Sequence, residues 1–106
     1  TSVAVANFNL DFLKFKNIFQ AEPPIDSGYH FGSRLVIKKD KLYVSAGERG
    51  GGIIAQDPKK HPGSIIRIHL DGSIPKDNPK FKGKDALILN VEICKKVGNE
   101  IQIFVV

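Results

Sequence analysis

Several residue types are scarce in this 106-residue sequence, and the shortages limit what the protein can be. There is no Trp, no Met and a single Cys, Cys94, so a disulfide within the chain is excluded. No apolar run approaches the ~20 residues that a membrane-spanning helix needs, so we expect no membrane span. Because the first residue is Thr1 rather than Met, we expect the chain to begin inside a longer reading frame. The sequence is then uninformative about a signal peptide.

Acidic residues are also outnumbered, with 11 Asp and Glu against 16 Lys and Arg, which makes the net charge +5. A basic balance favours an anionic partner, including nucleic acid. The lysines are scattered, however, and their densest groups fall in expected turns with few aromatic residues between them. We therefore expect no nucleic acid as a partner. A small basic β-module that binds nucleic acid is the alternative, and salt-dependent retention on DNA would favour it.

Helical patterns are absent, because no stretch shows a sustained helical period bounded by caps. Apolar and polar residues instead alternate, which predicts an all-β protein with strands at spacings near ten residues, as in propellers, barrels and sandwiches. Such an array on its own would leave open apolar edges, so we expect a piece of a larger closed assembly of sheets. The predicted strands cover residues 1–8, 12–20, 34–38, 41–46, 64–70, 87–93 and 101–106.

Two of these strands, 34–38 and 41–46, are expected to form a hairpin around a Lys39-Asp40 turn, which we call the central hairpin. Residues 47–63 are rich in Gly and Pro and predict a long loop. The strand at 64–70 predicts two faces: an apolar one with Ile66, Ile68 and Leu70 and a polar one with Arg67 and His69.

Phosphate-binding and metal-binding patterns are incomplete. Gly47 and Gly52 have the separation of P-loop glycines, but Ile53 stands where the lysine belongs and no helix is expected to follow, so we predict a plain loop. The three histidines and Cys94 lack the spacing of zinc ligands, so no metal ligand is assigned. His61, in a proline-flanked part of the loop, is expected to face solvent.

His30 and Glu48 are the candidate site residues, because they flank the central hairpin. In its expected register, opposed residues have numbers that sum to about 79, and 30 + 48 is 78. Gly32 and Gly47 are candidates for a bulge that completes the match. A carboxylate beside an imidazole can orient it as a general base. A surface hairpin with polar ends explains the same pair without any chemistry, and the spacing leaves both interpretations open.

Four segments of the chain match one known family: FKNIFQAEPP, DSGYHFGSRLVI, LYVSAGERG and AQDPKKHPGSIIRIHLDGSIPKDNP. They are similar to the soluble dehydrogenases of sugars that depend on pyrroloquinoline quinone (PQQ). This is the glucose/sorbosone dehydrogenase family, which includes the aldose sugar dehydrogenases. The resemblance covers residues 1 to about 85, and HFGSR and LDGSIPKDNP at this separation are its most specific parts.

The resemblance implies a fold and a mechanism. The fold is a six-bladed β-propeller, of which this chain holds about one and a half blades: residues 1–20 end one blade and residues 30–70 begin the next. His30 corresponds to the general base, which also contacts the cofactor, and Glu48 corresponds to the acid that orients it. The base takes the proton of the sugar's anomeric hydroxyl while the C1 hydride passes to the C5 carbonyl of PQQ. Arg34 and Arg49 match motif positions too, and we expect Arg34 to have a structural role.

The partners implied by the resemblance are an aldose sugar, an external electron acceptor and calcium, whose ligands are expected outside this chain. The expected location is periplasmic or secreted. After Lys84 the chain departs from the family, because no Arg-Asn-Pro-Gln segment for the cofactor follows. We therefore expect a partial propeller over 1–106, with family-like residues 1–85 and a tail, 86–106, that is divergent or read in a shifted frame. We expect the chain alone to be inactive. A non-catalytic propeller that binds proteins is the main alternative function.

Overall fold

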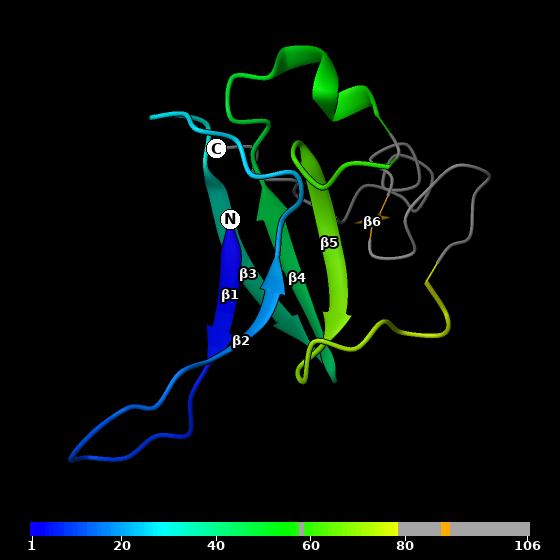
Figure 1. The fold of residues 1–106 in the computed structure, drawn as a ribbon. Coiled ribbons are helices and arrows are strands. Elements are labelled where there is room, and N and C mark those ends of the chain that lie inside the picture. The colour runs from blue at the N-terminus through cyan, green and yellow to red at the C-terminus, as the bar shows by residue number, and fades with distance from the viewer. Residues whose placement is uncertain (58, 79–87, 90–106) are drawn as a thin grey trace.

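The computed structural model describes residues 1–57, 59–78 and 88–89, whose strands form two antiparallel sheets (Figure 1). A short 3-10 helix, η1 (Gly52–Gln56), lies between β4 and β5. Within the described residues, no helix has the length and apolar character needed to cross a bilayer. The smaller sheet has β1 (Ser2–Val5) and β2 (Lys16–Gln20), and the larger has β3 (Gly32–Lys38), β4 (Lys41–Ala46), β5 (Ser64–His69) and β6 (Ile88–Leu89), in that order.

The core lies where the two sheets meet, because each sheet presents one apolar face. Along β4, Leu42, Val44 and Ala46 are buried, and the residues between them are half-buried. This period of two places alternate side chains on opposite faces of a strand. On β5, Ile66 and Ile68 have no exposed surface at all. The buried apolar cluster consists of Val3, Phe19, Ala21, Leu42, Val44, Ile66 and Ile68, and so joins both sheets.

The larger sheet is a meander, since its strands follow one another in chain order, as in one blade of a β-propeller. Among the described strands β3 is an edge, and its apolar residues Leu35, Val36 and Ile37 are 55%, 58% and 64% exposed. An open apolar edge agrees with the expectation of a piece of a larger assembly. The predicted strand at 101–106 and most of the predicted strand at 87–93 lie outside the described residues.

The central hairpin is confirmed as β3 and β4, with a tight turn at residues 39–40.

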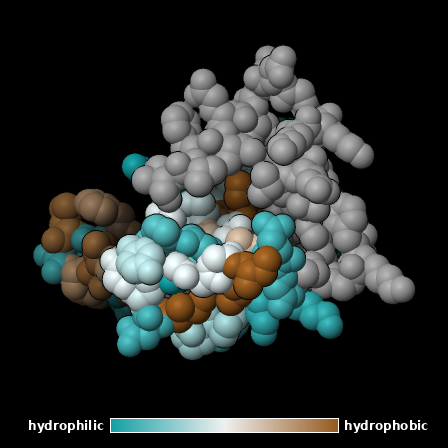
Figure 2. All heavy atoms as spheres, turned by 90° about the horizontal axis from the view of Figure 1, so that it is seen from above, coloured by the Kyte–Doolittle hydropathy of each residue, from teal (hydrophilic) through white to brown (hydrophobic). Residues whose placement is uncertain are grey.

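The strand predicted at 12–20 is too long, because only Lys16–Gln20 pairs with β1. The connection before it projects from the sheets, so its apolar residues have no core to enter (Figure 1). Figure 2 shows apolar side chains gathered on this projection. Its exposed apolar residues are Phe8, Leu10, Phe12, Leu13 and Phe15.

Two predictions on side-chain burial are wrong. Leu70 does not continue the apolar face of β5, because the strand ends at His69 and the chain turns there; Leu70 is 46% exposed. His61 does not face solvent, because the loop folds back on the end of the smaller sheet. It is buried, its Nδ1 accepts the N–H of Glu22 at 2.8 Å, and its ring lies 5.5 Å from that of Phe19.

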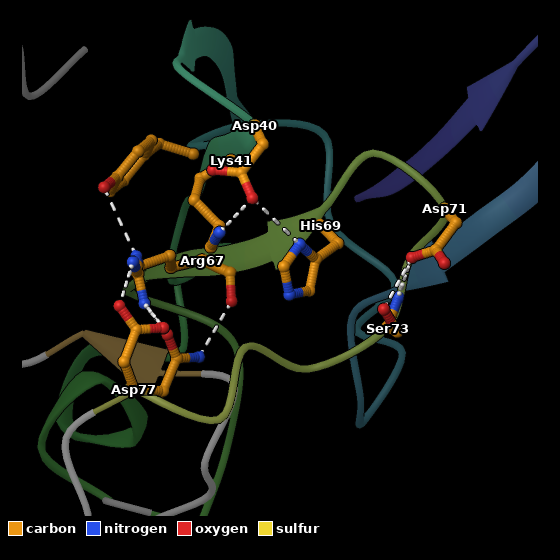
Figure 3. A network of polar contacts seen from close by, with 9 residues as sticks. Asp40, Lys41, Arg67, His69, Asp71, Ser73 and Asp77 are labelled. Carbon is orange, nitrogen blue, oxygen red and sulfur yellow. Dashed lines mark hydrogen bonds and ion pairs between the residues drawn. The ribbon is translucent and has the colours of Figure 1, made fainter.

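A polar network fixes the segment after β5 (Figure 3). The two Nη atoms of Arg67 donate to the carboxylate oxygens of Asp77 at 3.0 and 2.9 Å. Arg67 Nε also donates to the Tyr43 hydroxyl at 3.3 Å, and Asn78 donates to the backbone oxygen of Arg67 at 2.9 Å. The polar face predicted for Arg67 is therefore real, and it ties residues 77–78 to β5.

This network predicts a loss of stability in acid. The hydrogen bond from Arg67 lowers the pKa of Asp77 from 3.8 to about 2. The folded protein thus binds this proton less tightly than the unfolded chain. The stabilisation is complete above about pH 4 and disappears as the pH falls towards 2. The effect is modest because the Asp77 side chain is largely exposed.

Urea unfolding between pH 2 and 6, followed by circular dichroism, would measure this loss. Asp77→Asn is expected to make the dependence on pH shallower. Some dependence remains, because hydrogen bonds also lower the pKa of Asp40, Glu48 and Asp71. A variant with the wild-type slope would contradict the assignment.

Candidate active site

The register of the central hairpin brings its two polar ends together. Leu35 pairs with Val44, so opposed residues sum to 79, whereas Gly32 pairs with Ala46, which sums to 78. The change is a β-bulge between Gly32 and Leu35. The predicted register and the predicted bulge are both present. His30, two residues before β3, therefore lies opposite Glu48, two residues after β4.

The side chains of His30 and Glu48 form a hydrogen bond between Nδ1 and Oε1. The same Oε1 accepts the backbone N–H of Gly50 at 3.1 Å. The hydrogen bond from His30 holds the pKa of the Glu48 carboxyl below its ordinary value, so this group is a carboxylate near neutral pH. An acceptor at Nδ1 keeps the imidazole proton there, which leaves Nε2 with a lone pair. The His30 side chain is 56% exposed, against 26% for Glu48, so the imidazole is open to solvent.

The main chain around the pair is tightly interlocked. The N–H of Gly47 donates to the backbone oxygen of Phe31 at 3.1 Å, and the N–H of Arg49 to that of His30 at 3.3 Å. His30 and Arg49 have φ angles of 56° and 57°, in the left-handed region. Each such non-glycine residue costs roughly 1–3 kcal/mol and persists only where its surroundings hold it. The site therefore contains strain that its contacts maintain.

Aromatic and cationic side chains support the segment that carries His30. The Tyr29 ring meets the imidazole edge to face, with centroids 4.6 Å apart. The Arg49 guanidinium lies 3.6 Å from the centre of the Phe31 ring and donates to the backbone oxygen of Ser27. Sequence reasoning matched Arg49 to a motif but gave it no role. The only signal was its position directly after Glu48.

Arg34 lies apart from these contacts, since its side chain is exposed. Its backbone N–H donates to the Ser45 hydroxyl at 3.0 Å, a bond that does not involve the side chain, so the structural role expected for Arg34 stays a prediction. His69 is at the far end of the sheet, opposite Lys41 and 3.6 Å from Asp40. Neither residue takes part in the His30 site.

Ligand sites other than this pair find little support. In residues 1–57, 59–78 and 88–89, no three His, Cys, Asp or Glu side chains gather closely enough to hold a metal ion. The glycine-rich segment after Glu48 enters η1, a single short 3-10 helix of five residues, rather than a long helix that could bind phosphate. Cys94 lies outside the described residues. Among the described residues, the His30–Glu48 pair is therefore the candidate catalytic site.

Comparisons with known proteins agree on one family. Residues 1–89 match the family described as glucose/sorbosone dehydrogenase. The chain is 36% identical over 90 residues to the aldose sugar dehydrogenase YliI of Escherichia coli, covering 81% of this chain and 24% of that protein. It is 34% identical over 89 residues to quinoprotein glucose dehydrogenase B of Acinetobacter calcoaceticus, covering 58% of this chain and 19% of that one.

Solved structures give the same result. A glucose dehydrogenase crystal structure superposes with a TM-score of 0.76 at 29% identity, over 82% of this chain and 27% of that one. The soluble aldose sugar dehydrogenase of Escherichia coli, in its apo-form, superposes with a TM-score of 0.75 at 34% identity, again over 82% and 27%. The chain therefore spans about a quarter of these relatives. The expected fold, part of a six-bladed β-propeller, is confirmed.

Proposed function

The chain belongs to the glucose/sorbosone dehydrogenase family, and on that premise we propose that it supplies the general base for the oxidation of an aldose sugar at C1. The observation that carries the proposal is the hydrogen bond between His30 Nδ1 and Glu48, which leaves the lone pair of Nε2 to accept a proton, on a side chain that is 56% exposed. Among the described residues Nε2 has no hydrogen-bond partner. In the proposed complex, its hydrogen-bond partner is the sugar's anomeric hydroxyl.

In the proposed reaction His30 Nε2 removes the hydroxyl proton, and the C–O bond becomes a carbonyl as C1 loses a hydride. PQQ would supply the oxidising chemistry when bound, as the acceptor for this hydride. Glu48 fixes the tautomer of His30 and stabilises the imidazolium that forms. Half-buried Glu48 and the covering Tyr29 ring keep the imidazole in one orientation.

Among the described residues, His30 is the one that we propose contacts the cofactor. Its side chain is 56% exposed and is hydrogen-bonded through Nδ1, so ring surface remains for contact with PQQ and the sugar. In the described part of the chain, no three Asp, Glu, His or Cys side chains gather to hold a metal ion such as calcium. We propose that calcium, if the whole protein uses it, is bound by other parts. A periplasmic or secreted location and an external electron acceptor belong to the same proposal.

A chimera tests the proposal, because this chain spans about a quarter of its relatives. Residues 1–78 would replace the matching segment of the Escherichia coli aldose sugar dehydrogenase. With PQQ and calcium added, we expect dye reduction that depends on an aldose, and we expect none from the 106-residue chain alone. A folded chimera without activity would refute the proposal and favour a non-catalytic binding module.

A further inference from the structure

We propose that Arg49 is a positioning residue for His30, a role that rests on the proposed function of His30 as the base. Arg49 is half-buried, and its guanidinium holds the His30 segment at two points. One point precedes His30: an Nη atom donates to the backbone oxygen of Ser27. The other follows it: the guanidinium stacks on Phe31 at 3.6 Å. His30 lies between the two.

The segment around His30 needs the contacts of Arg49 because its backbone is strained. His30 has a φ of 56°, and an L-residue leaves this conformation unless neighbours prevent it. A backbone bond from Arg49 to the oxygen of His30, at 3.3 Å, restrains the main chain from one side. The guanidinium restrains both flanks. If it were removed, His30 would relax, its Cβ would turn, and the imidazole would lose its alignment with Glu48.

Within the part of the chain that the structure describes, Arg49 forms no ion pair. Its other terminal nitrogen, Nη1, is buried and has no hydrogen-bond partner in the described part of the chain. The described residues therefore give the guanidinium Ser27 and Phe31 as its partners. A planar guanidinium can stack on a ring and donate in its own plane at once, which the ammonium of lysine cannot do.

The experiment uses the ¹⁵N-labelled 106-residue chain, without sugar or cofactor. Two-bond ¹H–¹⁵N spectra at about pH 8, where an ordinary imidazole is neutral, report which ring nitrogen carries the proton. In the wild type we expect His30 as one tautomer, protonated at Nδ1. In Arg49→Ala we expect a mixture, seen as Nδ1 and Nε2 shifts that move towards each other. Arg49→Lys should be intermediate.

Arg34→Ala is the matched control, because it removes an exposed arginine from the same hairpin and should leave the His30 spectrum unchanged. The His61 signals report folding, since that ring is buried and hydrogen-bonded. A folded Arg49→Ala with a wild-type His30 spectrum overturns the proposal. If Arg49→Ala does not fold, Arg49→Lys and Phe31→Leu decide, and wild-type spectra in both overturn it.

This result is separable from that of the proposed function. A tautomer change in Arg49→Ala together with an inactive wild-type chimera would support Arg49 as a positioning residue and refute His30 as the general base. An active chimera with no tautomer change in Arg49→Ala would support His30 as the base and refute the role of Arg49.

Discussion

His30→Ala is expected to lower kcat for sugar oxidation by the chimera roughly 10²–10⁴-fold, the usual contribution of a positioned general base. The proton of the anomeric hydroxyl must leave as the hydride departs. Glu48 cannot replace the imidazole, because its carboxylate is bonded to His30 Nδ1 and already accepts two hydrogen bonds. Steady-state dye reduction at saturating sugar would measure the loss, and KM should change much less than kcat.

His69→Ala is the control for this substitution. It removes the same kind of side chain from the same sheet, but at the end of β5 that pairs with Lys41, far from Glu48. We expect its kcat to stay close to that of the unmodified chimera. If His30→Ala and His69→Ala had similar rates, His30 would not be the base. The remaining explanation for the pair would then be a polar cap on a surface hairpin.

Gly47→Ala is expected to lower the free energy of unfolding by about 3 kcal/mol or more, at the upper end of overpacking effects. A Cβ on Gly47 would lie 1.7 Å from the backbone oxygen of His30 and 2.9 Å from the carbonyl carbon of Phe31. Both neighbours are main-chain atoms, so no side chain can move aside. The segment before β3 and the segment after β4 would have to separate. This would break the Gly47 to Phe31 hydrogen bond and the His30–Glu48 contact.

Gly28→Ala is the matched control for Gly47→Ala, since a Cβ there meets no atom within 4 Å. We expect it to change the free energy of unfolding by no more than about 0.5 kcal/mol, as for ordinary surface substitutions. Urea unfolding of both variants, followed by circular dichroism, would give the comparison. Equal stability of the two variants would show that the close approach of the loops is not essential to the fold.

The hairpin could be predicted because its determinants are local. The alternation from 34 to 46 and a two-residue turn at Lys39-Asp40 set which residues oppose each other, and the glycines indicated where the register would change. Counting along the sequence was therefore enough to bring His30 and Glu48 together. The length of β2 was not predictable in this way. Its apolar pattern continues to Phe12, but only residues from Lys16 onwards have a partner strand.

Contacts between distant segments were beyond this kind of reasoning. His61 and Glu22 are 39 positions apart, and nothing near His61 indicates that its ring is buried against the smaller sheet. Arg49 is a similar case. Its two contacts reach 22 and 18 positions back along the chain, to Ser27 and Phe31, and arise only once β3 and β4 have paired.

The amino-acid sequence by itself determined the all-β character, the hairpin register and the facing of an imidazole and a carboxylate, since short-range alternation and turn chemistry suffice for these. Only the tertiary structure decided which side chains hold that imidazole in place. The reason is physical: a strained backbone such as that of His30 is stable only through contacts from the rest of the fold, and the segments that make them meet after the sheets have formed.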